Sequence, residues 1–162
     1  MRHLVFRFYP AIAVLALLLG FAIVSAQPSD ARGALAGSLV AGVLGFCYFV
    51  QQQKLGETLL FKDLFTGFNS RYDRLNGPLA RLSPGTSLTR EEMDLLVDYL
   101  NLCAEEFLFH QQGFILPTVW RSWCRGMLQY LEVAAISDFV QAELAKDDYY
   151  GLTLAHIRKG SA

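Results

Sequence analysis

Apolar residues dominate two stretches near the start of the chain, residues 8–26 and residues 33–50. Neither stretch contains Asp, Glu, Lys or Arg. In a helix rising about 1.5 Å per residue, each is roughly 27–29 Å long, close to the hydrocarbon thickness of a bilayer. A helix also satisfies its own backbone polar groups, as lipid requires. We therefore predict a transmembrane hairpin, with the polar residues 27–32 as its loop.

Basic residues lie outside both ends of this predicted hairpin. Two arginines, Arg2 and Arg7, precede it, whereas its loop holds only one acidic and one basic residue. The basic residues that follow it are Lys54, Lys62, Arg71, Arg74 and Arg81. Cytoplasmic flanks of membrane helices are enriched in Lys and Arg, so both termini are expected in the cytoplasm.

The first apolar stretch also has a second interpretation. Two arginines, an apolar run and the small residues Val24-Ser25-Ala26 resemble a secretory signal peptide with its cleavage site. The run is long for a signal, and a second apolar stretch follows at once. We favour the hairpin, and the mass of the mature protein distinguishes the two interpretations.

Small residues recur every four positions along the second apolar stretch, which places them on one helix face. Such a face lets another helix backbone approach closely in a membrane. The face packs either within the hairpin, against Ala13, Ala16 and Gly20, or against other copies of the chain. Its members are Gly33, Gly37, Ala41 and Gly45, beside a parallel row of Ala34, Ser38 and Gly42.

The remaining residues suffice for one small domain, so we predict a membrane hairpin at 1–53 and a cytoplasmic helical domain at 54–162. Residues 51–81 contain five basic and three acidic residues, whereas residues 82–162 contain six basic and eleven acidic ones. The basic part suits anionic lipid headgroups. The acidic part argues against nucleic acid as a partner, because such binding depends on neutralising phosphates.

Hydrophobic periodicity predicts that the second domain is all-helical, and thus that the whole chain is. A wide apolar face runs from Leu60 to Leu75, expected to face a protein core or else the membrane interface, and Asn76-Gly77-Pro78 is expected to end that helix. A loop is predicted at Ser83-Pro84-Gly85. Thr89 and Glu92 have the spacing of a capping box that begins the next helix.

Further signals divide the rest of the chain into helices. Gly113 is expected to end the helix that Thr89 begins, and Pro117 to begin another with an apolar side. Ser137-Asp138 is expected to cap a third helix. A last segment at 148–159 has apolar residues for packing. The apolar residues are Trp120, Trp123, Cys124, Met127 and Leu131 after Pro117, and Tyr149, Leu152 and Ile157 in the last segment.

Two of these helices are joined by a short connection and should lie antiparallel. The first carries Glu105 and Glu106, and the second carries Arg121 and Arg125 four residues apart. We therefore predict that Glu105 or Glu106 pairs with Arg121 or Arg125 and stabilises the fold or a partner contact.

No catalytic motif stands out, so we do not expect an enzyme or a cofactor. Cys47, Cys103 and Cys124 lack metal-ligand spacing and are expected to be reduced thiols. His110 lies four residues after Glu106, which favours a local ion pair over catalysis. Glu105 and Glu106 point about 100° apart on a helix and cannot readily share one metal or proton.

Three segments resemble a diffuse family of small bacterial membrane proteins with a helical cytoplasmic domain. They are residues 68–76, 99–106 and 120–123. The two-span layout also resembles inner-membrane effectors of anti-phage systems of the retron type. That resemblance implies a defence toxin that damages the membrane when a protein partner releases it. The alternative is a passive membrane anchor or assembly subunit without toxic activity.

Overall fold

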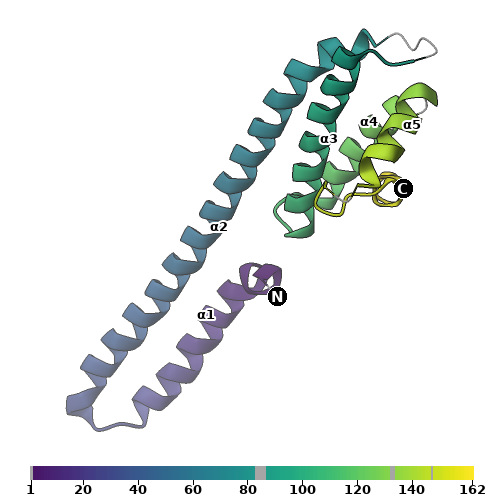
Figure 1. Cartoon of the computed structure of the whole chain (residues 1–162). Helices are drawn as coiled ribbons and strands as arrows, with labels where there is room; N and C mark the ends of the chain where they lie inside the picture. The colour runs from purple at the N-terminus through teal and green to yellow at the C-terminus, as the bar shows by residue number, and fades with distance from the viewer. Residues whose placement is uncertain (1, 83–86, 132–133, 147) are drawn as a thin grey trace. The chain divides into compact units, whose positions relative to one another are not determined.

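A computed structural model describes the backbone of residues 2–82, 87–131, 134–146 and 148–162. The predicted loop at Ser83-Pro84-Gly85 and the side chains of Arg2 and Leu131 lie outside the described residues. The described elements are all helical, without a strand among them, which confirms the all-α class (Figure 1). The helices are α1 (Arg2–Ser25), α2 (Ser29–Ala80), α3 (Arg90–Gln111), α4 (Pro117–Leu131), α5 (Ala134–Leu144) and α6 (Leu154–Ser161).

The chain divides into two compact units, Met1–Leu59 and Leu60–Ala162. The division falls inside α2, a few residues after the sequence-predicted boundary between residues 53 and 54. Helix α2 therefore contributes its N-terminal part to the first unit and its C-terminal part to the second.

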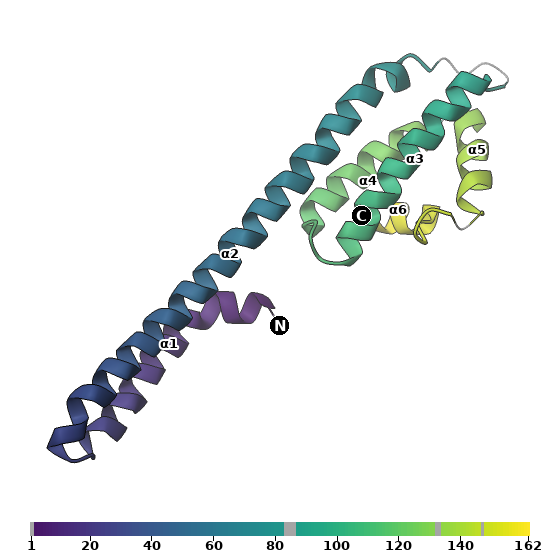
Figure 2. The ribbon, with the colours of Figure 1, turned by 60° about the vertical axis from the view of Figure 1, so that its left-hand side comes forward.

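In the first unit, α1 and the N-terminal part of α2 lie side by side as an antiparallel pair (Figures 1 and 2). Ala13 of α1 and Val50 of α2 are buried. Gly20 allows the side chain of Leu39 to pack directly on the α1 backbone, where a Cβ would clash with it. Near the open end of the pair, Gln51 Nε2 donates a hydrogen bond to Tyr9 Oη at 3.5 Å.

The ends of these helices differ from the prediction. Helix α1 begins at Arg2, before the start of the predicted stretch at residue 8, so Pro10 lies inside it. Because proline lacks an N–H and its ring crowds the preceding turn, it bends a helix, and α1 changes direction in its N-terminal turns (Figure 2). Helix α2 begins at Ser29, which shortens the predicted loop, and Arg32 Nε donates to Gln27 O across the turn at 2.6 Å.

Both α1 and α2 are long and apolar enough to cross a membrane. A signal sequence near the N-terminus or the core helix of a soluble protein meets the same criteria of length and composition. A core helix is mostly covered by protein, whereas only 6% of the residues in the apolar 18-residue stretch of each helix are buried here. Leu18, Phe21 and Leu44 are each more than 60% exposed. Burial thus separates these helices from core helices.

Helix α3 supplies much of the core of the second unit, with seven buried apolar residues and the buried Glu106. The capping box is confirmed: the Thr89 side chain accepts from the Glu92 N–H, and the Glu92 carboxylate accepts from the Thr89 N–H at 2.8 Å. Gly113 follows the helix end with φ of +80°, a conformation that suits glycine. The buried apolar residues are Leu96, Tyr99, Leu100, Leu102, Cys103, Ala104 and Phe107.

The remaining helices of the second unit pack on α3 and on each other. Helix α4 begins at Pro117 as predicted. Helix α5 begins at Ala134, so Ser137 lies within it rather than at its cap. In the C-terminal segment Tyr149, Leu152 and Ile157 are buried, as the sequence predicted.

The C-terminal part of α2 joins this core through aromatic side chains. Phe68 is buried, with its ring centroid 5.8 Å from those of Phe109 and Trp123. The predicted core-facing stripe is therefore confirmed at this part of α2. The expected break at Asn76-Gly77-Pro78 is wrong, because α2 continues to Ala80. Pro78 lies in the last turn, where its missing N–H removes at most one helical hydrogen bond.

Gly160 allows α6 to approach α4, and this contact gives a test of the packing. A Cβ at Gly160 would lie 2.6 Å from both Cys124 Sγ and Trp120 Nε1, whereas a Cβ at Gly67 meets nothing within 4 Å. We expect Gly160→Ala to lower the free energy of unfolding by about 1–3 kcal/mol through overpacking. Gly67→Ala should raise it by about 0.5–1 kcal/mol, because alanine favours a helix.

Both Trp residues of the chain lie on α4, so tryptophan fluorescence during denaturation of the detergent-solubilised full chain reports on the second unit. Equal stabilities of the two variants would contradict this account of the α4–α6 contact.

Candidate functional site

The small-residue row of the second apolar stretch lies on the surface of the first unit. Gly33, Gly37, Ala41 and Gly45 are all exposed. A Cβ added at any of the three glycines would meet no atom within 4 Å. The row therefore does not pack within the hairpin, and that sequence-based interpretation is wrong for it.

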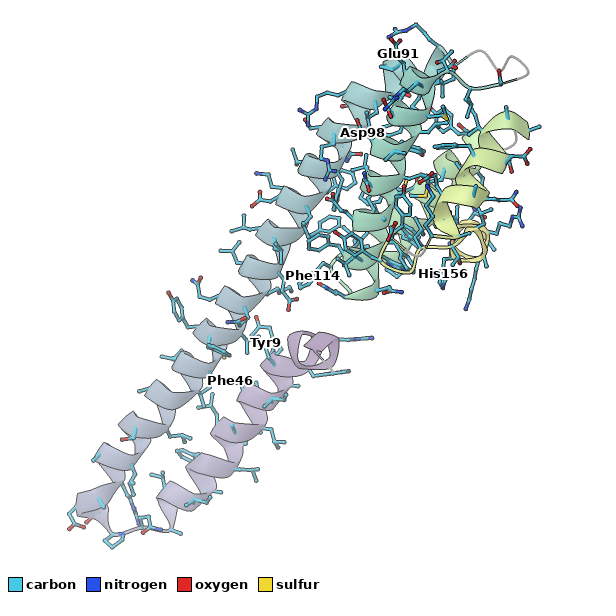
Figure 3. The ribbon with its side chains drawn as sticks, viewed as in Figure 1. Tyr9, Phe46, Glu91, Asp98, Phe114 and His156 are labelled. Atoms are coloured by element: carbon cyan, nitrogen blue, oxygen red, sulfur yellow. The ribbon has the colours of Figure 1, made fainter. Side chains whose placement is uncertain are left out.

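A different face of α2 packs against α1. Leu39, Val43, Phe46 and Val50 are partly or fully buried, at helical spacing, on the side nearly opposite the glycine row. Ala13 and Ala16 of α1 line a groove with Gly42, Val43 and Phe46 of α2 (Figure 3 labels Phe46). Alanines on α1 and larger side chains on α2 thus form most of the contact, which leaves the row that begins at Gly33 uncovered.

In the second unit, Glu105 pairs with a residue other than the two arginines predicted as its partners. Arg71 of α2 binds both carboxylate oxygens of Glu105, at 2.5 and 3.0 Å. This ion pair raises the pKa of Arg71. Arg125 instead donates from Nε to Ser161 O at 3.2 Å, and Arg121 is exposed on α4. Glu105 therefore pairs across the α2–α3 contact rather than with either predicted arginine of α4.

Glu106 is the one buried charged residue among those described, with 6% of its surface exposed. It lines a cavity of about 180 Å³ that α2, α3 and α4 enclose and that is partly open to solvent. No described residue forms a hydrogen bond with its carboxyl group. The other lining residues are Asn69, Tyr72, Tyr99, Ser122, Trp123, Gly126 and Met127.

Burial determines the protonation of this cavity. Desolvation raises the pKa of Glu106 from 4.5 to about 8, because a charged carboxylate loses its hydration there. The nearby Arg71 guanidinium favours the charged form and partly opposes this rise, while the Glu105 carboxylate adds to it. Burial likewise raises the pKa of Tyr72 and of Cys124, each to about 12, and the pKa of Tyr99 and of Cys103. At neutral pH the cavity therefore holds mainly a neutral carboxyl group.

His110 is held by contacts other than the expected pair with Glu106. Its Nδ1 lies 3.2 Å from Ile115 O, which can only accept, so Nδ1 carries the proton. Its ring stacks on Trp120 with centroids 5.1 Å apart. Among the described residues no group of three His, Cys, Asp or Glu side chains is placed to hold a metal ion.

The spacing of apolar residues on α3 indicates that Glu106 lies on the buried face of this helix. Leu96, Tyr99, Cys103 and Glu106 follow each other at spacings of three and four residues, and the first three are buried. Glu106 therefore continues the buried face of α3, whereas its neighbour Glu105 does not. The cavity itself also depends on α2 and α4, whose positions this pattern does not specify.

The buried carboxyl group predicts a specific pH dependence of stability. Between pH 4.5 and about 8 the folded protein retains a proton on Glu106 that the unfolded chain releases. The contribution of the neutral Glu106 carboxyl to the free energy of unfolding is therefore fully present below the unfolded pKa. It falls as the pH rises through this range. We expect Glu106→Gln, which mimics the neutral form, to remove this dependence.

One pKa unit corresponds to about 1.4 kcal/mol, so the wild type should lose at least about 2 kcal/mol relative to the variant between about pH 5 and 8. Denaturation of both proteins in detergent, followed by tryptophan fluorescence, measures the difference. Parallel pH profiles would exclude a buried neutral Glu106.

Comparisons of the chain with protein-family models, with curated proteins and with solved structures found no match. The resemblance to small bacterial membrane proteins therefore stays a prediction. The row on α2 and the cavity at Glu106 are the two features whose geometry bears on function.

Proposed function

We propose that this protein is a membrane-anchored interaction protein. Its helices α1 and α2 form a two-span hairpin in the bacterial inner membrane, and the second unit lies in the cytoplasm, where it binds a protein partner. The apolar exposure of the first unit supports this assignment, because apolar surface on that scale is stable in lipid and not in water. The basic residues at both outer ends of the hairpin support a cytoplasmic location of both termini.

The observation that carries the proposal is the uncovered row of Gly33, Gly37, Ala41 and Gly45. In lipid, helix association depends on close packing, since the tails are as apolar as the side chains. A flat face of glycine and alanine allows close contact with another helix. Because α1 occupies the opposite side of α2, this face is available to a second copy of the chain.

Self-association provides a route by which such a protein acts on the membrane. In this scheme the partner holds the second unit in the resting state, and its release allows hairpins to assemble and perturb the bilayer, as in an anti-phage effector. The alternative function is a passive anchor or assembly subunit. A passive anchor needs no uncovered small-residue face, so the row favours the effector.

Cross-linking tests the orientation of the row. In a Cys47→Ser background we expect Ala41→Cys to form disulfide-linked dimers in membranes under mild oxidation, because Ala41 lies in the row. Val43→Cys, which faces α1, should not form them. Cys103 and Cys124 are 2% and 0% exposed and should contribute little. Non-reducing electrophoresis gives the readout, and dimers from Val43→Cys alone would refute the proposed face.

Induced expression without a partner tests the effector function. We expect the wild type to depolarise the inner membrane and stop growth, measured with a potential-sensitive dye and by colony counts. Gly37→Leu should relieve the effect by at least about tenfold, because its side chain blocks close helix approach, whereas the small side chain of Gly37→Ala should preserve it. Harmless expression of a wild-type protein that still cross-links through Ala41→Cys would favour the passive anchor.

A further inference from the structure

The cavity at Glu106 has the composition of a ligand site. At about 180 Å³ it slightly exceeds the roughly 150 Å³ cavity that accommodates benzene in another protein. Its walls combine one carboxyl group with the aromatic side chains of Tyr72, Tyr99 and Trp123. An apolar body with one polar contact is the usual pattern of a small-molecule site.

None of the described residues forms a hydrogen bond with the carboxyl group of Glu106. Arg71 is the nearby cation, but both of its bonds are made to Glu105. Among the described residues no fully buried side-chain oxygen lacks a hydrogen-bond partner, so the Glu106 oxygens keep some exposure to the cavity. The carboxyl therefore faces the cavity as an acceptor for a donor that comes from outside.

Two further acceptors lie in the walls. Asn69 donates from Nδ2 to Phe65 O at 2.9 Å, which leaves its Oδ1 as the acceptor of that amide. The Ser122 hydroxyl lies on the exposed side of α4 and also lines the cavity. An ammonium group has three donors and no acceptor, so these oxygens match it.

We propose that this cavity binds a small organic cation, a protonated primary amine with a compact apolar body, whose ammonium group donates to the Glu106 carboxylate. The apolar body lies against Trp123 and Met127, and the aromatic faces add a cation–π attraction. The proposal is independent of membrane association, because every residue that it uses belongs to the second unit.

Other ligand classes fit less well. An anion would find no cationic side chain among the lining residues. Calcium and magnesium prefer several oxygen ligands arranged around the ion, and here only one carboxylate lines the cavity. A neutral molecule can bond to the protonated carboxyl but gains no charge attraction.

Cation binding should be linked to proton release. Because Glu106 is mainly protonated at neutral pH, an ammonium ion that binds its carboxylate displaces that proton to solvent. A neutral ligand displaces none. Proton release is therefore a readout that separates the two kinds of binding.

Isothermal titration of the detergent-solubilised full chain tests the proposal, with empty micelles as the reference. The probes are benzylammonium and n-butylammonium, with benzyl alcohol and benzoate as neutral and anionic comparisons. We expect the wild type to bind at least one ammonium probe at least about tenfold more tightly than benzyl alcohol, as a charge-assisted hydrogen bond predicts. At pH 7, titrations in two buffers of different ionisation enthalpy should show release of up to one proton.

Variants identify the residues responsible. Glu106→Gln should weaken ammonium binding roughly ten- to a hundredfold and abolish proton release. Glu91→Gln makes the same substitution at an exposed position at the start of α3 (Figure 3) and should change neither. Gly126→Leu keeps Glu106 but fills the cavity, since a Cβ at Gly126 meets only open space, and should also abolish binding.

Three outcomes would overturn the proposal: no saturable binding of either ammonium probe, equal binding of benzylammonium and benzyl alcohol, or unchanged binding in both Glu106→Gln and Gly126→Leu. Thermal melts of each variant establish that it is folded. If one of these two variants does not fold, ammonium binding by the other still tests the proposal.

Discussion

The solvent of the first unit is the constraint on which the rest of the structure depends. On the N-terminal part of α2, Leu44 and Tyr48 are about two-thirds exposed, whereas on its C-terminal part Phe68 and Leu79 are almost fully buried. One continuous helix therefore changes from apolar residues exposed around most of its surface to a single buried stripe. A helix of the first kind needs lipid or other apolar partners, while one of the second kind needs only a protein core.

The hairpin contact follows from the same constraint. In the proposed lipid setting, hydrophobic attraction would not hold the helices together, so the fit of side chains would decide which faces meet. Ala13 and Gly20 of α1 accept the larger side chains of α2, and Leu39 occupies the space above Gly20. The packing of α1 on α2 therefore does not involve the glycine row. The glycine row stays uncovered in the first unit.

Local signals in the sequence predicted local structure well. The cap at Thr89, the stop at Gly113 and the start at Pro117 each depend on a few neighbouring residues, and each is confirmed. The break expected at Pro78 was wrong, because α2 continues for two residues beyond this proline. Sequence signals of this kind report on residues in contact along the chain and not on which helices meet.

Predictions that depended on helix packing were therefore less successful. The expected partners of Glu105 lay on the next helix in sequence, whereas Arg71 comes from α2, which precedes α3. For the same reason the sequence did not determine whether the glycine row faces α1 or faces outward, because two apolar helices can meet on any face. The cavity needed three helices to be placed, so only the position of Glu106 on the buried face of α3 was visible beforehand.

The ion pair between Arg71 and Glu105 and the neighbouring buried carboxyl group of Glu106 contribute differently to the free energy of unfolding. Arg71 and Glu105 are each more than a third exposed, and pairs at that exposure contribute about 0–1 kcal/mol. Glu106 is almost fully buried, and the same Arg71 does not offset its desolvation. The neutral form of Glu106 is thus stable without a partner, but its carboxylate is not. Any cation that reaches the cavity gains an interaction for which the protein itself supplies no committed partner, and this imbalance is what makes the site selective for charge.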